Sequence, residues 1–187
     1  MVSGFIVYNE TRPKLIAVEQ YSTYAAEASS LQWIAERSEV IIKANPVKRM
    51  EPFKGKESGG NKRDVISTDT IVEVSEVVRL SPSLEGKIKV GDLIPVRILG
   101  GEVDKITFRT GNEDLLPLDQ NMLLFLVDGK KEPGLPKTTT DYYSVVGTFS
   151  GAFKLTSDGS AQRDKVKDSY KLKDILDTVK TTKLKSF

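Results

Sequence analysis

Turns rich in glycine and proline divide this sequence into short runs of β-branched and aromatic residues. The runs lie at 15–18, 39–44, 64–80, 93–99, 105–110, 121–128 and 142–155. Their composition and the turn residues that bound them are typical of β-strands, and glycines within the last run predict a bend. Because no long helical pattern alternates with the runs, they favour an antiparallel barrel or sandwich over a parallel sheet with crossover helices.

Two segments have the periodicity of short helices. Residues 31–37 follow Ser30, which predicts an N-cap, and they place apolar side chains on one face. Residues 172–179 carry apolar side chains at positions i, i+3, i+4 and i+7, which predicts a small amphipathic helix near the C-terminus. We expect this second helix to cover an open end of the β-structure; docking on an anionic surface is the alternative.

Two segments have no periodicity and combine proline, glycine and charge, which is typical of exposed loops. They are residues 51–63 and 129–141. Loops on a rigid β-framework are where such folds place their contacts, so the sequence predicts a binding surface on these two loops. Its candidate residues, which include the start of the following run, are Phe53, Lys54, Lys56, Lys62, Arg63, Lys130, Lys131, Tyr142 and Tyr143.

Charge is distributed unevenly along the chain. The 28 Lys and Arg residues nearly balance the 26 Asp and Glu residues, which leaves a net charge of +2. Residues 161–187, however, contain 8 basic and 4 acidic residues, a local charge of +4. We therefore expect three parts: an N-terminal extension at 1–28, a β-domain at 29–160, and a basic tail with its helix at 161–187.

The complete absence of histidine and cysteine removes most familiar active-site chemistry. Zinc sites made of imidazole and thiolate, disulfides, and Ser-His-Asp or Cys-His nucleophiles are all excluded. A carboxylate pair such as Asp114 with Asp119, or a Ser-Lys dyad, is what remains for catalysis. Nothing in the sequence fixes the spacing that paired carboxylates require, so we predict a protein that is not an enzyme and has no cofactor.

Two further motifs resemble ligand sites but lack their defining residues. The acidic group Glu113-Asp114 with Asp119 offers hard oxygen ligands, yet it lacks the alternating acidic loop of a calcium site. Gly100-Gly101 follows a strand, but no helix with the Lys-Ser/Thr of a phosphate loop comes after it. We therefore predict that the acidic group belongs to a solvated loop that binds no metal, and that Gly100-Gly101 forms a turn.

The order of these segments resembles a domain of exported, largely uncharacterised proteins of Gram-positive bacteria and archaea. The likeness covers about residues 29–156 and depends on the helix and first strand together with LEGKIKVGDLIPVRILGG, NMLLFLVDG and YYSVVGTFSGAFKL. The resemblance implies a mainly β, OB-like antiparallel barrel of about five to seven strands, similar in outline to netrin-like modules. It also implies export to the cell surface, and it does not imply an enzyme.

These observations predict a non-enzymatic binding or interaction module that is secreted or at the cell surface, with an unknown protein or cell-envelope ligand as its partner. The alternative is an intracellular OB-fold protein that binds single-stranded nucleic acid with the basic tail and with the aromatic residues of 142–153. Residues 1–9 lack the basic start of a signal peptide, so a cytoplasmic location follows if Met1 is the native start. No apolar run reaches the length of a transmembrane segment.

Overall fold

The computed structural model describes residues 14–17, 30–58, 63–109, 115–132, 134–147, 149–163 and 168–185. Within these ranges the protein is mainly β, with two short α-helices and one 3-10 turn. The strands are β1 (Lys14–Ala17), β2 (Val40–Arg49), β3 (Phe53–Lys56), β4 (Asp64–Leu80), β5 (Leu93–Leu99), β6 (Gly101–Val103), β7 (Ile106–Arg109), β8 (Met122–Asp128), β9 (Tyr143–Val145), β10 (Ala152–Leu155), β11 (Ser160–Arg163) and β12 (Asp168–Lys171). The helices are α1 (Leu31–Arg37), α2 (Leu172–Thr181) and the 3-10 turn η1 (Pro82–Leu84). Every predicted run overlaps a strand, and both predicted helices are confirmed.

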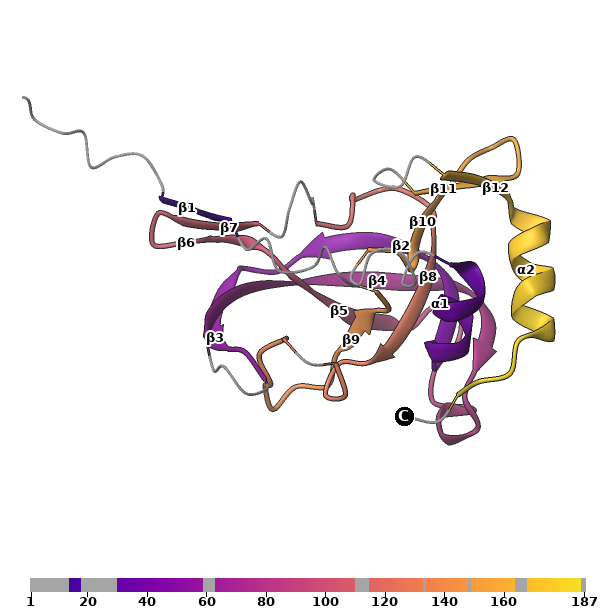
Figure 1. Ribbon diagram of the computed structural model, residues 1–187, viewed down its shortest axis with the longest axis horizontal. Helices are drawn as coiled ribbons and strands as arrows, with labels where there is room; N and C mark the ends of the chain where they lie inside the picture. Colours follow the sequence, from indigo (N-terminus) through magenta and orange to yellow (C-terminus); the bar gives the residue numbers. More distant parts are fainter. Residues whose placement is uncertain are drawn as a thin grey trace, which may run out of the picture.

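Five strands of the main sheet pair in a closed cycle. Strands β8, β2, β4, β5 and β9 are neighbours in this order, and β9 pairs again with β8. All of these pairings are antiparallel except that of β5 with β9. Strands β10, β11 and β12 extend the sheet from β8, while β6, β7 and β1 form a separate small sheet at one end of the long axis (Figure 1).

One edge of β8 pairs with two different strands. Its residues 126–128 pair with β9, and its residues 122–124 pair with β10. At the junction, Val146 N donates to Phe125 O and Phe125 N donates to Gly151 O, at 2.9 and 2.8 Å. Strands β9 and β10 are therefore one run along β8, interrupted by a short turn at 146–151 as the glycines predicted.

The long strand β4 connects three parts of the sheet. It pairs with β3 at its start, with β5 in its middle and with β2 along its second half. Register shifts against β2 mark bulges, which let a 17-residue strand bend around the cycle.

Alternation of side chains divides the interior into separate clusters, as expected for strands. Cluster one lies inside the five-strand cycle, and its buried residues include Val40, Ile42, Val72, Val74, Ile94, Val96, Ile98, Leu124 and Leu126. Cluster two lies on the opposite face of β2 and β8, and it comprises Ile34, Ala35, Ile41, Leu123, Phe125, Val127, Val146, Phe153, Ala161, Ile175 and Val179. Cluster two therefore holds α1, α2 and β10 against the outward face of β8.

The C-terminal helix does not cover an open end of the sheet, so that expectation is wrong. Ile175 and Val179 of α2 are buried in cluster two beside residues of α1 and β8. This apolar face is already occupied, which also leaves nothing for docking on an anionic surface. Within the described part of the chain, neither helix has the length and apolarity needed to span a membrane.

Arg79 of β4 links the C-terminal ends of both helices. Its guanidinium donates to Ala35 O and Ser38 O at the end of α1, and to Val179 O and Thr182 O at the end of α2. Carbonyl groups at a helix C-terminus lack intrahelical donors and carry partial negative charge, so one half-buried cation satisfies both ends. Burial lowers the pKa of Arg79 below its ordinary value.

Two segments contain more β-structure than predicted. The loop at 51–63 includes β3, which pairs with β4, and the basic tail includes β12. The expected boundary after residue 160 falls inside β11, which pairs with β10. Gly100-Gly101 is the turn from β5 to β6 that was predicted, and both residues have positive φ, 137° and 128°.

Candidate binding surface

Arg97 is the centre of the surface on which the two predicted loops meet. It lies on the outward face of β5, since Val96 and Ile98 point into cluster one, and it is only 2% exposed. Asp69 of β4 stands directly opposite. The guanidinium binds its carboxylate at two points, with Nε–Oδ1 at 2.6 Å and Nη2–Oδ2 at 2.8 Å. Such two-point ion pairs fix geometry as well as adding energy.

Both loops contact this one cation. Nη1 of Arg97 donates to Pro136 O at 2.7 Å. The guanidinium carbon lies 3.7 Å from the ring centre of Tyr142 and 4.7 Å from that of Phe53. The hydroxyl of Tyr142 also donates to Pro136 O, at 3.2 Å. Arg97 is therefore held between an aromatic ring from each loop, which stabilises a desolvated cation.

The loops also contact each other directly. Gly134 N donates to Ser58 O at 2.9 Å, and Ser58 N donates to Leu135 O at 3.3 Å. A Cβ atom on Gly55 would lie 2.4 Å from Pro136 Cβ, and one on Gly129 would lie 2.0 Å from the ring of Tyr142. Glycine at these positions allows a backbone approach that no larger residue permits. Segments 51–58 and 129–142 thus form one continuous surface.

The cations predicted for this surface are paired with carboxylates. Nζ of Lys54 lies 2.9 Å from Asp104, and Nζ of Lys56 lies 2.6 Å from Asp64. The remaining described pairs are Arg63 with Glu57, Lys130 with Asp141, and Lys131 with the buried Glu39. Lys62 lies outside the described residues. Exposed pairs of this kind contribute about 0–1 kcal/mol each, so they set the charge of the surface more than its stability.

The predicted aromatic residues are packed rather than displayed. Tyr142 is 2% exposed, while Phe53 and Tyr143 are half-buried. Burial raises the pKa of both tyrosines, and for Tyr143 the nearby Asp128 raises it further. Among the described residues, no Phe, Tyr or Trp side chain is exposed. These rings hold the loops in place and are not free for stacking.

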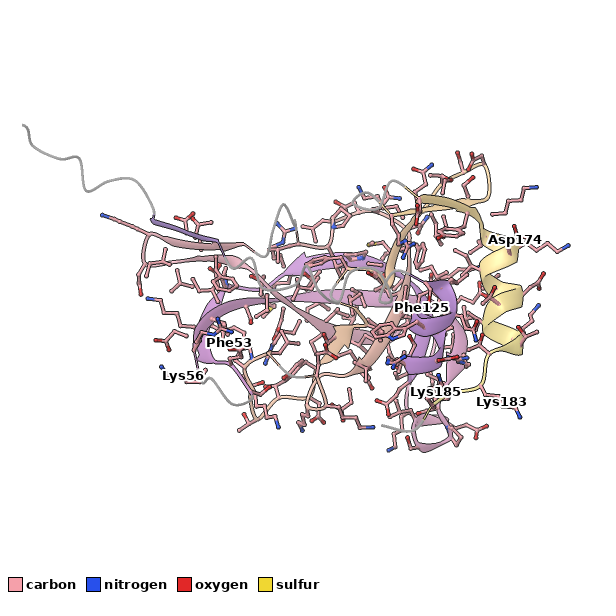
Figure 2. All side chains as sticks on the ribbon, in the orientation of Figure 1. Phe53, Lys56, Phe125, Asp174, Lys183 and Lys185 are labelled. Atoms are coloured by element: carbon pink, nitrogen blue, oxygen red, sulfur yellow. The ribbon has the colours of Figure 1, made fainter. Side chains whose placement is uncertain are left out.

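The basic tail is remote from the loops. Figure 2 shows Phe53 and Lys56 near one end of the long axis, and Asp174, Lys183 and Lys185 toward the other. Nζ of Lys185 pairs with Glu36 of α1 at 2.5 Å, and Lys180 lies 3.5 Å from Asp177. The tail and the loops therefore do not form a single positive groove.

Sequence reasoning missed Arg97 and Asp69, although they organise the surface. The available signal was Arg97, which is the one charged residue of the run 93–99, whereas Asp69 is one of five charged residues in the run 64–80 and gave no signal of its own. Of the acidic residues considered for chemistry, Asp119 is exposed, whereas Glu113 and Asp114 lie outside the described residues. In the part of the chain that is described, no group of three or more carboxylates is placed to hold a metal.

Comparison of the chain with protein-family models, curated proteins and solved structures finds no match.

Glu132 of the second loop gives a test of electrostatics at this surface. Burial raises the pKa of its carboxyl above the ordinary value, and no described cation pairs with it. A raised folded-state pKa means that ionisation destabilises the fold as pH rises through that value. Glu132→Gln should therefore raise the melting temperature at about pH 7 and leave it unchanged at about pH 4, where both proteins are neutral at this site. Thermal unfolding at both pH values measures the difference; an equal gain at both would contradict the assignment.

Proposed function

We propose that this chain is a non-enzymatic binding module built on an OB-like barrel. The cycle of five pairings supports the barrel, because closing a sheet on itself removes the unpaired edges of those strands. Counted in chain order, the five strands of the cycle are β2, β4, β5, β8 and β9. Cluster one fills their common interior with aliphatic side chains, as small barrels require.

The position of the two loops carries the functional part of the proposal. OB-folds bind ligands on the face of their second and third strands and on the loops that join strands one to two and four to five. In this chain the corresponding elements are β4, β5, segment 50–63 and segment 129–142. These are the two segments that meet over Arg97.

A protein partner fits this surface better than a nucleic acid. Single-stranded nucleic acids require a positive groove and aromatic rings on which bases stack. Four of the described loop lysines, Lys54, Lys56, Lys130 and Lys131, face carboxylates, and the described aromatic rings are shielded. Surfaces with mixed charge and little exposed aromatic area suit the polar rim of a protein interface. Export and association with the cell envelope are proposed from the sequence resemblance.

Site-specific photocrosslinking in the source organism tests this function. A photoreactive residue would replace Lys54 or Lys137, which are exposed on the two loops, and Lys173 on α2 would serve as the matched control. We expect both loop positions to give an adduct of one common mass in the envelope fraction, and the control position to give none. An adduct at Lys173 alone, or a purely cytosolic product, would contradict the proposal.

Fluorescence anisotropy with a labelled single-stranded oligonucleotide distinguishes the proposed function from the nucleic-acid-binding alternative. We expect no saturable binding at low ionic strength. Binding whose affinity falls steeply with salt would instead establish phosphate neutralisation and replace the proposal with the nucleic-acid alternative.

A further inference from the structure

The small sheet at one end of the long axis contains a strand from a distant part of the chain (Figure 1). Its order is β1, β7, β6, so β7 is the central strand. Strand β6 pairs antiparallel with one edge of β7. Strand β1 pairs parallel with the other edge, from Lys14 opposite Ile106 to Ala17 opposite Arg109. Among the described strands, β1 pairs with β7 alone, so the outer edge of β7 is covered by this one short segment.

The hairpin of β6 and β7 is attached to the main sheet through contacts that do not involve β1. Phe108 of β7 is buried with Ile66 and Leu99 in a third apolar cluster. At the start of the hairpin, Gly100 N donates to Ile66 O at 2.8 Å, and the Thr68 hydroxyl donates to Gly100 O at 2.7 Å. These contacts hold the edge of β7 in place when β1 leaves it. A preformed edge costs less free energy to bind than one that must first be ordered.

The hairpin requires a third strand, but it holds β1 by a short pairing. Its two-residue turn, Asp104-Lys105, has φ angles of 50° and 63°, the positive values of a tight type I′ hairpin. A hairpin of two strands is marginally stable alone, and its open edge leaves N–H and C=O groups unpaired. Strand β1 satisfies this edge over only four residues, in the parallel arrangement that is slightly less stable per residue. Another extended segment can therefore replace it.

We infer that the outer edge of β7 is a binding site for an extended aliphatic peptide, and that β1 occupies this site in cis. Strand addition derives its affinity from main-chain hydrogen bonds and its specificity from alternate side chains. The present occupant indicates the ligand chemistry, because Lys14–Ala17 is one cation followed by three aliphatic residues. A partner chain that presents such a segment parallel to β7 displaces β1. The site shares no residue with the two loops, so its failure would leave the proposed function intact.

Peptide binding to the full-length chain tests the inference. The probe is a fluorescein-labelled peptide of residues 12–19, and its binding is measured by fluorescence anisotropy. Leu15→Pro/Ile16→Pro in the protein removes two consecutive N–H donors, one of which faces β7 in a parallel pair. In the natural chain β1 competes at an effective concentration of about 1 mM. We expect saturable binding to the proline variant and an affinity about tenfold weaker, or less, for the natural chain. A peptide with the same two prolines is the matched control and should not bind.

Disulfide trapping locates the site, and the chain has no cysteine of its own to interfere. A probe peptide with Leu15→Cys should form a mixed disulfide with the Thr107→Cys protein, because these positions are paired in register. Glu102→Cys is the matched control. It lies opposite Thr107 on β6, two strand spacings or about 10 Å from the peptide, which is too far for a disulfide.

A reversible lock tests the site without the proline variant. In the chain with Leu15→Cys/Thr107→Cys, oxidation should fix β1 on β7 and abolish binding of the labelled peptide, and reduction should restore it. Three results would overturn the inference: equal affinity for the natural chain and the proline variant, no binding to a proline variant whose far-ultraviolet circular dichroism is native, or equal binding to the oxidised and reduced lock.

Discussion

Replacing Arg97 with methionine is expected to lower the free energy of unfolding by about 3–5 kcal/mol. The substitution leaves the carboxylate of Asp69 mostly buried without its partner. It also removes the cation between the rings of Phe53 and Tyr142 and the donor to Pro136 O. Urea denaturation monitored by circular dichroism measures the change, with the m-value as a check on two-state behaviour.

A double-mutant cycle separates the free-energy cost of leaving the Asp69 charge uncompensated from the cost of losing the packing of Arg97. In Asp69→Asn/Arg97→Met the remaining partner is neutral, so the double variant should be more stable than Arg97→Met alone. Arg97→Lys keeps the charge but cannot bind Asp69 at two points or stack flat on Tyr142, so an intermediate loss is expected. If the single variant does not fold, the double variant still permits the comparison with the natural chain. A loss below about 1 kcal/mol for Arg97→Met would show that the ion pair does not hold this surface.

The second large effect is expected at Arg79. Arg79→Met removes the donors to four carbonyl groups at the ends of α1 and α2. We expect the free energy of unfolding to fall by about 2–4 kcal/mol. The substitution removes hydrogen bonds from a charged group to carbonyl acceptors and the favourable interaction of that charge with two helix ends. Hydrogen exchange should show that the amides of α2 lose protection before those of β2 and β4.

Lys180→Met on the exposed side of α2 is the matched control for this prediction. Lys180 is a cation near the same helix end, but its one ion pair, with Asp177, lies at 3.5 Å in solvent. We expect it to change stability by no more than about 0.5 kcal/mol. Equal effects of the two substitutions, or unchanged protection of α2 in Arg79→Met, would show that the helices are held by cluster two alone.

Local sequence was sufficient for the elements that carry their own pattern. Helix α1 begins where the Ser30 hydroxyl accepts from Trp33 N, as the N-cap predicted. The apolar run Met122–Asp128 is buried on both faces because β8 separates cluster one from cluster two. Two clusters on opposite sides of one strand explain a run with no polar alternation.

Elements formed by pairing rather than by composition were not predictable. Strand β3 has the sequence Phe-Lys-Gly-Lys, and it is a strand because β4 supplies its hydrogen bonds. Strands β11 and β12 are similarly polar, with Ala161 and Tyr170 as their contributions to cluster two. A short polar segment gains strand geometry only when a neighbouring strand supplies its hydrogen bonds, so its own composition does not predict it.

The candidate loops were predictable, whereas the residue that joins them was not. Proline, glycine and charge identified both loops from composition alone. Arg97 appears in sequence as one basic residue in an apolar strand, and its role depends on Asp69, Pro136 and Tyr142. Those contacts bring together segments more than 25 positions apart, which no local pattern encodes.

The division of one β8 edge between β9 and β10 has a consequence for how the polypeptide reaches its final shape. During synthesis β8 can pair with β2 as soon as both have emerged, but the cycle closes only after Tyr143–Val145 is available. The outward side chains Leu123, Phe125 and Val127 are covered first by α1 and β10, and α2 completes their burial last. A nascent or prematurely terminated chain that ends near residue 160 lacks Ile175 and Val179, so it exposes part of this apolar cluster to chaperones and proteases.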